Sequence, residues 1–235
     1  MKISLYGGIK KKSAEEGIPT QVVTRRVLRS PGGRLASIAT KIGIQMNCKL
    51  GGLPWLPNIP IGNVMTVGFE IVKDSSKPKR YGCLVATMDL KADTRDIQNP
   101  SDRQTRFFSN VEEINGPDCS IQLTTSMLLA LDEYFNEHGC APDRIIFYRG
   151  GTGEGDLPYL KETEVSILKD RLGDYYTEKG RDLKLVYMVV TKKINTRFFV
   201  ANSDRHIEAG TVLDNTITLD ERYELLDVDT LSYRM

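Results

Sequence analysis

Two acidic features of the sequence could do chemistry, and each stands at the end of an apolar segment. Glu70 lies near the end of residues 64–72, which are otherwise Val, Met, Thr, Gly, Phe and Ile, and the segment GGTGEGD (150–156) follows RIIFYR. Functional groups in open α/β sheets gather at the carboxyl ends of the strands. A carboxylate among apolar residues is costly to bury unless it is paired or bound to a metal. The residues alone leave two interpretations of Glu70 open: a metal ligand, or a solvent-facing or ion-paired strand residue.

The apolar spacing predicts a mixed α/β chain that would position these groups. It predicts a helix at residues 6–12, a strand at 20–27, and an amphipathic helix with the stripe Leu35, Ile38, Ala39, Ile42 and Met46, ended by Gly51-Gly52. A proline-rich linker at 53–60 precedes strands at 64–72, 81–88 and 106–111, a helix at 118–139, a strand at 144–148, a helix at 158–172 and a strand at 183–190. This order predicts a sheet whose later strands are joined by parallel crossovers.

The composition is that of an ordinary globular protein and excludes several classes. The 235 residues include 32 Lys and Arg against 31 Asp and Glu, a net charge of +1, with 40% apolar and 27% charged residues. This excludes a disordered chain, a collagen and a strongly basic nucleic-acid coat, so any nucleic acid would bind through a local patch. No apolar run approaches the roughly 20 residues that span a bilayer, so we expect no membrane partner. Four scattered cysteines without a CxxC pair favour reduced thiols in the cytoplasm or nucleus and argue against a zinc site.

Four segments together resemble Argonaute proteins of the Piwi clade. They are QMNCKLGG (45–52), VGFE (67–70), RIIFYRGGTGEGDL (144–157) and KKINTRFF (192–199), in that order, and the resemblance extends from about residue 6 to about residue 226. It implies the C-terminal part of a MID domain at residues 1–52. A PIWI domain with a ribonuclease H-like fold, a mixed α/β sheet flanked by helices, would follow at 53–235. The resemblance also implies a fragment, without the N-terminal and PAZ lobes and truncated at the C-terminus of the PIWI domain.

The resemblance implies a site for the 5′ monophosphate of a single-stranded guide RNA. In the family, a Tyr-x-x-x-Lys helix, a Gln on a following strand and residues of the KLGG helix hold this phosphate; the matching residues here are Tyr6, Lys10, Gln21, Gln45 and Lys49. The spacing is compatible with this role, because residues four apart share a helix face. Lysine donors and glutamine amides can meet phosphate oxygens, while a tyrosine ring stacks on the first base. Without the resemblance, these positions would be interpreted as a solvated helix face.

The resemblance also implies a degenerate slicer site. Cleavage in the family resembles two-metal phosphodiester hydrolysis by an Asp in VG-x-D, a Glu before the next helix, an Asp in YRDG and a C-terminal His or Asp. The first position here is Glu70, the second falls at Asp118, the third is Gly150, and the fourth lies beyond Met235. Asp118 is alternatively an N-cap after Gly-Pro, and Asp156 a helix cap. We therefore expect Mg²⁺ binding at Glu70 to be weak or lost.

The predicted function is that of a Piwi-like protein that binds a small guide RNA of the piRNA kind, with its complementary target RNA, in RNA-mediated gene silencing, without slicer activity. One alternative is an active metal-dependent endoribonuclease that uses Glu70, Asp118 and Glu154. A second alternative is a protein-interaction module that binds no RNA, because PIWI domains in the family also dock partner peptides. Divalent-metal binding would distinguish the first alternative, and phosphate-dependent RNA binding the second.

Overall fold

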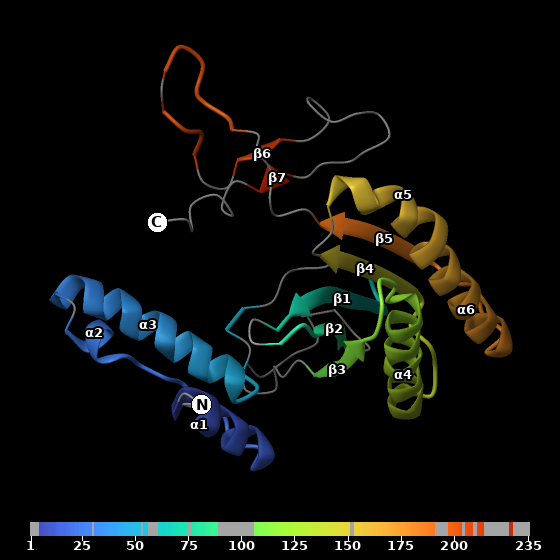
Figure 1. Cartoon of the computed structure of the whole chain (residues 1–235), viewed down its shortest axis with the longest axis horizontal. Helices are drawn as coiled ribbons and strands as arrows, with labels where there is room; N and C mark the ends of the chain where they lie inside the picture. The colour runs from blue at the N-terminus through green and yellow to red at the C-terminus, as the bar shows by residue number, and fades with distance from the viewer. Residues whose placement is uncertain are drawn as a thin grey trace.

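The core of the protein is built on a five-stranded sheet (Figure 1). The computed structural model describes residues 5–29, 31–52, 54–55, 61–74, 77–88, 106–150, 153–190, 197–203, 205–208, 211–213 and 226–227. The strands lie in the order β3-β2-β1-β4-β5. Neighbours β1–β2 and β2–β3 are antiparallel, whereas β1–β4 and β4–β5 are parallel. The mixed sheet with parallel crossovers is therefore confirmed, with bounds of β1 (Val64–Lys73), β2 (Arg80–Thr87), β3 (Phe107–Ile114), β4 (Arg144–Gly150) and β5 (Leu185–Val190).

Two helices, α4 (Ser120–His138) and α6 (Val165–Glu178), cover one face of this sheet, as Figure 1 shows. Burial alternates along the strands, because successive side chains of a strand point to opposite faces. The inward side chains of the strands and the two helices form one apolar cluster that includes Met65, Val67, Phe69, Leu84, Ile145, Phe147, Leu123, Met127, Leu131, Leu168 and Leu172. Glu70 and Tyr148 belong to the opposite face and are exposed.

The helix predicted at residues 158–172 is longer and less regular than expected. It begins with a short 3-10 turn (Glu154–Asp156) and α5 (Leu157–Tyr159), with Pro158 in the first turn, where a missing N–H costs nothing. A π-helical turn, Leu160–Glu164, then leads into α6. Such turns widen a helix locally and are frequent at functional sites. Here the turn ends on Glu164, which is buried.

The N-terminal part consists of α1 (Leu5–Glu15), α2 (Arg25–Leu28) and α3 (Gly32–Lys49), and none of its described side chains is buried. The helices predicted at 6–12 and along the Leu35–Met46 stripe are confirmed. The strand predicted at 20–27 is wrong, because residues 20–24 are irregular and α2 follows. A β-branched run becomes a strand only when another strand pairs with it, and the carbonyl of Thr20 is bonded instead to lysine side chains.

The C-terminal part contains a two-stranded antiparallel pair, β6 (Val212–Leu213) and β7 (Leu226–Asp227). Of the KKINTRFF segment, only residues 197–199 lie within the described residues, and most of the predicted linker at 53–60 lies outside them. No helix in the described part of the chain has the length and apolar character needed to cross a membrane. The apolar cluster lies entirely after residue 60, and the proposed division at residues 52 and 53 stays a prediction.

Candidate functional site

Two lysine side chains from different helices converge on one backbone carbonyl. Lys10 of α1 donates to the Thr20 carbonyl at 2.8 Å and to its hydroxyl at 2.9 Å. Lys49, the last residue of α3, donates to the same carbonyl at 2.7 Å and to Oε1 of Gln21 at 2.5 Å. The Lys10 ammonium also lies 5.9 Å from the centre of the Tyr6 ring, within cation–π range. We call Tyr6, Lys10, Thr20, Gln21 and Lys49 the Thr20 cluster.

The Thr20 cluster carries positive charge that no carboxylate of the described residues neutralises. Two ammonium groups bonded to one oxygen lie side by side and repel each other. Neither Lys10 nor Lys49 forms an ion pair with a carboxylate among the residues that the structure describes. A phosphate placed between them would replace this repulsion by charge-assisted hydrogen bonds, which are the strong ones. The cluster is therefore suited to bind an anion.

Four of the five predicted phosphate ligands lie in this cluster, and the fifth lies beside it. Gln45 is exposed on α3 one turn before Lys49, so the two share a helix face. Thr20, whose backbone holds both lysines, was not predicted. Its position directly before Gln21 is the only sequence feature that could have suggested it.

Glu70 and Gly150, the first and third positions of the predicted slicer site, are neighbours in the sheet because β1 and β4 pair in parallel. Phe69 pairs with Arg149, so Glu70 and Gly150 follow side by side. A Cβ atom added to Gly150 would lie 3.5 Å from Cδ of Glu70 and 3.7 Å from Oε2, which is ordinary van der Waals contact. A side chain at position 150 would thus fit and would stand next to the Glu70 carboxylate. Glycine leaves that place without a ligand.

Asp118 lies directly before Cys119, the N-cap residue of α4, and its side chain bonds to the first residue of that helix. Its Oδ1 accepts hydrogen bonds from the Ser120 backbone N–H at 2.8 Å and the Ser120 hydroxyl at 2.7 Å. The hydrogen bond from the Ser120 hydroxyl has the largest effect on the pKa of Asp118. Together with the bonds from the Ser120 N–H and from Tyr159, it holds this pKa below its ordinary value despite partial burial. The N-cap predicted at Asp118 is therefore one residue too early, because Cys119 is the N-cap residue of α4, while a role of Asp118 in metal binding stays a prediction.

The described residues do not fit a two-metal centre. No group of three or more His, Cys, Asp or Glu side chains in the described ranges could hold a metal ion. Asp156 precedes α5 as its N-cap residue and accepts from the Gly153 N–H at 3.3 Å. The side chain of Glu154, the third residue of the alternative endoribonuclease, lies outside what the structure describes. Within the described residues, Glu70 is the carboxylate that stands beside Gly150.

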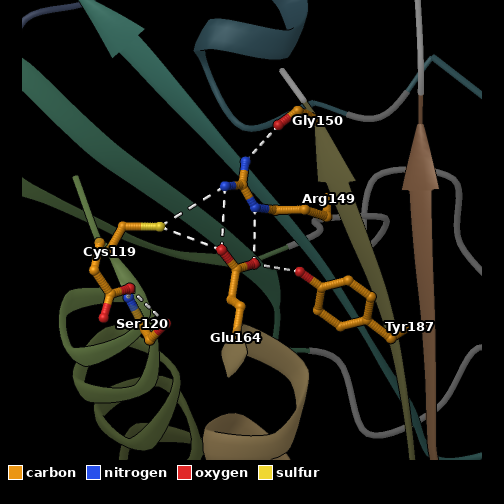
Figure 2. A network of polar contacts seen from close by, with 7 residues as sticks. Cys119, Ser120, Arg149, Gly150, Glu164 and Tyr187 are labelled. Carbon is orange, nitrogen blue, oxygen red and sulfur yellow. Dashed lines mark hydrogen bonds and ion pairs between the residues drawn. The ribbon is translucent and has the colours of Figure 1, made fainter. Parts of the chain in front are cut away.

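A buried ion pair between Arg149 and Glu164 lies next to Gly150 (Figure 2). Arg149 Nε donates to Glu164 Oε1 at 2.9 Å and its terminal nitrogen to Oε2 at 3.2 Å, and the two side chains are only 3% and 1% exposed. Tyr187 of β5 donates to Oε1, and the Cys119 thiol donates to Oε2 at 3.3 Å. Arg149 also donates to the backbone carbonyl of Gly150. We call Cys119, Arg149, Glu164 and Tyr187 the buried network.

The buried network shifts the pKa values of its members. Burial would lower the pKa of Arg149, but its hydrogen bonds and attraction to Glu164 outweigh this and raise it. Burial first, and then the charge of Glu164, raise the pKa of the Cys119 thiol to about 12 and that of Tyr187 well above its ordinary value. Arg149, Cys119 and Tyr187 therefore keep their protons at neutral pH and donate to the Glu164 side chain.

The buried network joins the elements that carry the two acidic positions. It links the end of β4 at Gly150, the start of α4 beside Asp118, the π-helical turn and β5, as the sticks in Figure 2 show. The buried network was not predicted from the sequence, although the positions of its charged residues give an indication of it. Arg149 continues the inward alternation of Ile145 and Phe147, so a charge was to be expected inside the sheet.

Comparison with known proteins gives a consistent result. The family described as "Piwi domain" matches residues 1–230. Protein aubergine of Drosophila melanogaster is 41% identical over 228 residues, which are 93% of this chain and 25% of that protein. The crystal structure of Drosophila Piwi superposes with a TM-score of 0.70 at 39% identity and covers 89% of this chain and 27% of that one. Clostridium butyricum Argonaute, solved with a guide DNA and a target DNA, shares the fold at a TM-score of 0.56 and 18% identity, over 82% of this chain and 23% of its own.

Proposed function

Because the chain belongs to the Piwi domain family, with Piwi-clade Argonaute relatives, we propose that it anchors the 5′ monophosphate of a small single-stranded guide RNA. The observation that supports this function is the convergence of Lys10 and Lys49 on Thr20, where no carboxylate of the described part of the chain pairs with either lysine. The chain spans about a quarter of the length of the relatives that it matches. We therefore propose three further properties for the whole protein only. They are pairing of the guide with a target RNA, RNA silencing in the cytoplasm or nucleus, and docking of partner peptides.

The chemistry of anchoring follows from the charges and donors of the Thr20 cluster. A terminal phosphate carries about −1.5 to −2 charges at pH 7 and offers three acceptor oxygens. Lys10 and Lys49 would turn from the Thr20 carbonyl to these oxygens, and the amides of Gln21 and Gln45 can donate as well. Each charge-assisted bond is worth roughly 1.5–3 kcal/mol. The Tyr6 ring offers a stacking surface for the first base.

The same proposal assigns no slicer activity to this chain. Two divalent cations close together repel, and only a cluster of carboxylates makes their joint binding favourable. Gly150 supplies no carboxylate beside Glu70, and Asp118 is engaged with Ser120. Glu70 can hold at most one weakly bound Mg²⁺. Loss of one electrostatic partner of a reacting group typically costs about 10²–10³ in rate.

The test compares RNAs that differ only at the 5′ end. Binding of 3′-labelled single-stranded RNA is measured by fluorescence anisotropy, with a 5′ monophosphate or a 5′ hydroxyl. We expect the phosphate to be preferred, and Lys10→Ala and Lys49→Ala to weaken binding of the phosphorylated RNA about tenfold or more. Lys11→Ala is the matched control, because Lys11 is exposed on the same helix and faces Glu15 at 3.9 Å. Equal affinity of the unmodified chain for both RNAs would contradict the proposal.

A further inference from the structure

Strand β3 lies at one edge of the five-stranded sheet, and within the described residues it pairs with β2 alone. The pairing is regular, without a bulge, from Phe107 opposite Thr87 to Ile114 opposite Arg80. Natural proteins protect such edges with short strands, proline, lysine or bulges, because the unpaired N–H and C=O groups of an edge can pair with another chain. Since β3 is eight residues long and contains neither proline nor lysine, its edge is suited to such pairing.

The hydrogen bonds to β2 show which backbone groups of β3 point away from the sheet. The Met88 N–H donates to the Arg106 carbonyl at 3.0 Å, so the even-numbered residues along this strand bond to β2. The odd-numbered residues Phe107, Ser109 and Val111 therefore direct their N–H and C=O groups to the open edge. Their side chains lie on the sheet face that α4 does not cover, where Phe107 and Val111 are 59% and 62% exposed.

The sequence of β3 is complementary to itself in one antiparallel register. When Ser109 lies opposite Ser109 of a second copy, Phe107 lies opposite Val111 and Arg106 lies opposite Glu112, and symmetry makes each of these pairs occur twice. Pairs of an aromatic with a β-branched residue, and of opposite charges, stabilise neighbouring strands. A shift of two residues in either direction separates both pairs, so the side chains select this register.

The two charged residues can form this pair without losing their present contacts. Arg106 faces Glu137 of α4 but its side chain remains 64% exposed, and a guanidinium has enough N–H donors for a second carboxylate. Glu112 accepts one hydrogen bond, from the Asn110 amide at 3.0 Å, and a carboxylate can accept several. Glu113, the other acidic residue of β3, lies 2.6 Å from the Lys79 ammonium, which offsets its charge.

We propose that two copies of this chain pair through their β3 strands, antiparallel and in this register, and so join two five-stranded sheets into one. Ser109 would exchange two backbone hydrogen bonds with Ser109 of the second copy, and Phe107 two with Val111. Because each copy contributes the same strand, the contact is twofold symmetric and closes as a dimer. A strand of another protein could satisfy the same backbone groups, but a second copy also matches the side chains. The inference is independent of RNA binding.

Sedimentation velocity of the full 235-residue chain, between about 1 and roughly 200 μM, tests the dimer. We expect a mass that rises with concentration from 26.4 kDa to twice that value. Ser109→Pro should keep the chain monomeric, because it removes an N–H that points to the open edge and makes no bond to β2. Amide exchange of Phe107, Ser109 and Val111 should slow at high protein concentration. The N–H groups of Phe108 and Asn110 already bond to β2, so their exchange should not change.

Charge reversal is a second test that does not depend on proline. Arg106→Glu would place glutamates opposite each other twice in the dimer, so we expect the dissociation constant to rise about tenfold or more. Glu112→Arg should have the same effect, whereas Arg106→Glu/Glu112→Arg restores opposite charges and should regain the dimer. The matched control is Lys169→Glu, because Lys169 is exposed on α6, which packs against α4; it should leave the dissociation constant unchanged.

Three results would overturn this inference. The first is a monomer over the whole concentration range, and the second is a dimer that Ser109→Pro and Arg106→Glu leave intact, since another surface would then form it. The third is a dimer that both single charge reversals disrupt and the double variant does not regain, because Arg106 and Glu112 would then not lie opposite each other. Growth beyond the dimer would contradict the closed twofold contact in the same way.

Discussion

Replacing Glu164 by Gln should destabilise the protein strongly, because it leaves a buried guanidinium without its counter-charge. Arg149 and Glu164 share two hydrogen bonds at 2.9 and 3.2 Å, and both side chains are almost completely buried. A Gln side chain would point an NH₂ donor at one of the donors of Arg149. Breaking one partner of such a pair typically costs 3–5 kcal/mol, so we expect a loss of about 4 kcal/mol in the free energy of unfolding. For a chain of this length, that corresponds to a melting temperature lower by roughly 8–16 °C.

Urea unfolding followed by circular dichroism measures this loss, with two comparisons that test the reasoning. Glu162→Gln is the matched control, because Glu162 lies two residues earlier in the same π-helical turn and is exposed; we expect a change within about 0.5 kcal/mol. The double variant Arg149→Met/Glu164→Leu should be more stable than Glu164→Gln, since apolar side chains of similar volume can replace a buried pair. If Glu164→Gln and Glu162→Gln were equally stable, the buried network would not have the role assigned to it.

Two further predictions concern the acidic positions. Gly150→Ala should change the free energy of unfolding by less than about 1 kcal/mol, because the added Cβ meets only ordinary contacts. Gly150→Asp should lose about 1 kcal/mol of stability in EDTA through repulsion from Glu70 and regain it in Mn²⁺, without target cleavage. Thermal melts with and without the metal measure this, and identical metal responses of the Ala and Asp variants would contradict it. Asp118→Asn should lower the free energy of unfolding at pH 7 by roughly 0.3–1 kcal/mol, the range for a charge at a helix N-terminus. Because the pKa of Asp118 is lowered in the folded protein, this deficit should close as the pH falls below the ordinary value of 3.8 and through the folded pKa. A pH-independent deficit in urea melts would refute the role of the ionised Asp118 side chain at the start of α4.

Most strands and helices were predictable because their apolar residues recur with the period of a helix, 3.6 residues, or of a strand, two residues. Leu123, Met127 and Leu131 recur at helical spacing in α4 and are buried, and burial alternates along β4. The strand expected at residues 20–27 failed for the opposite reason. Its β-branched composition is a local preference, and the Thr20 carbonyl is taken by two lysines that come from elsewhere in the chain. The sequence of residues 20–27 alone cannot show that these lysines, rather than a neighbouring strand, would bond to the Thr20 carbonyl.

The buried network could have been inferred, but only by reading two segments together. Glu164 occupies the inward position between Leu160 and Leu168, four residues from each, where another leucine would be expected. Arg149 takes the inward position of β4 after Phe147. Two opposite charges on core-facing positions predict a buried ion pair, because an unpaired buried charge is too costly. What the sequence could not supply is that both charges meet at the end of β4.

The geometry of the network explains how the fold can persist while the third acidic position is occupied by glycine. Arg149 holds the backbone carbonyl of Gly150, not its side chain, and Cys119 holds the start of α4 without using the carboxylate of Asp118. The frame behind both acidic positions is thus independent of which side chain they carry. The Thr20 cluster differs, since its lysines are at once the structural contacts and the proposed phosphate donors. We therefore expect substitution at position 150 to cost little stability, whereas substitution of Lys10 or Lys49 should change both the local structure and the proposed phosphate site.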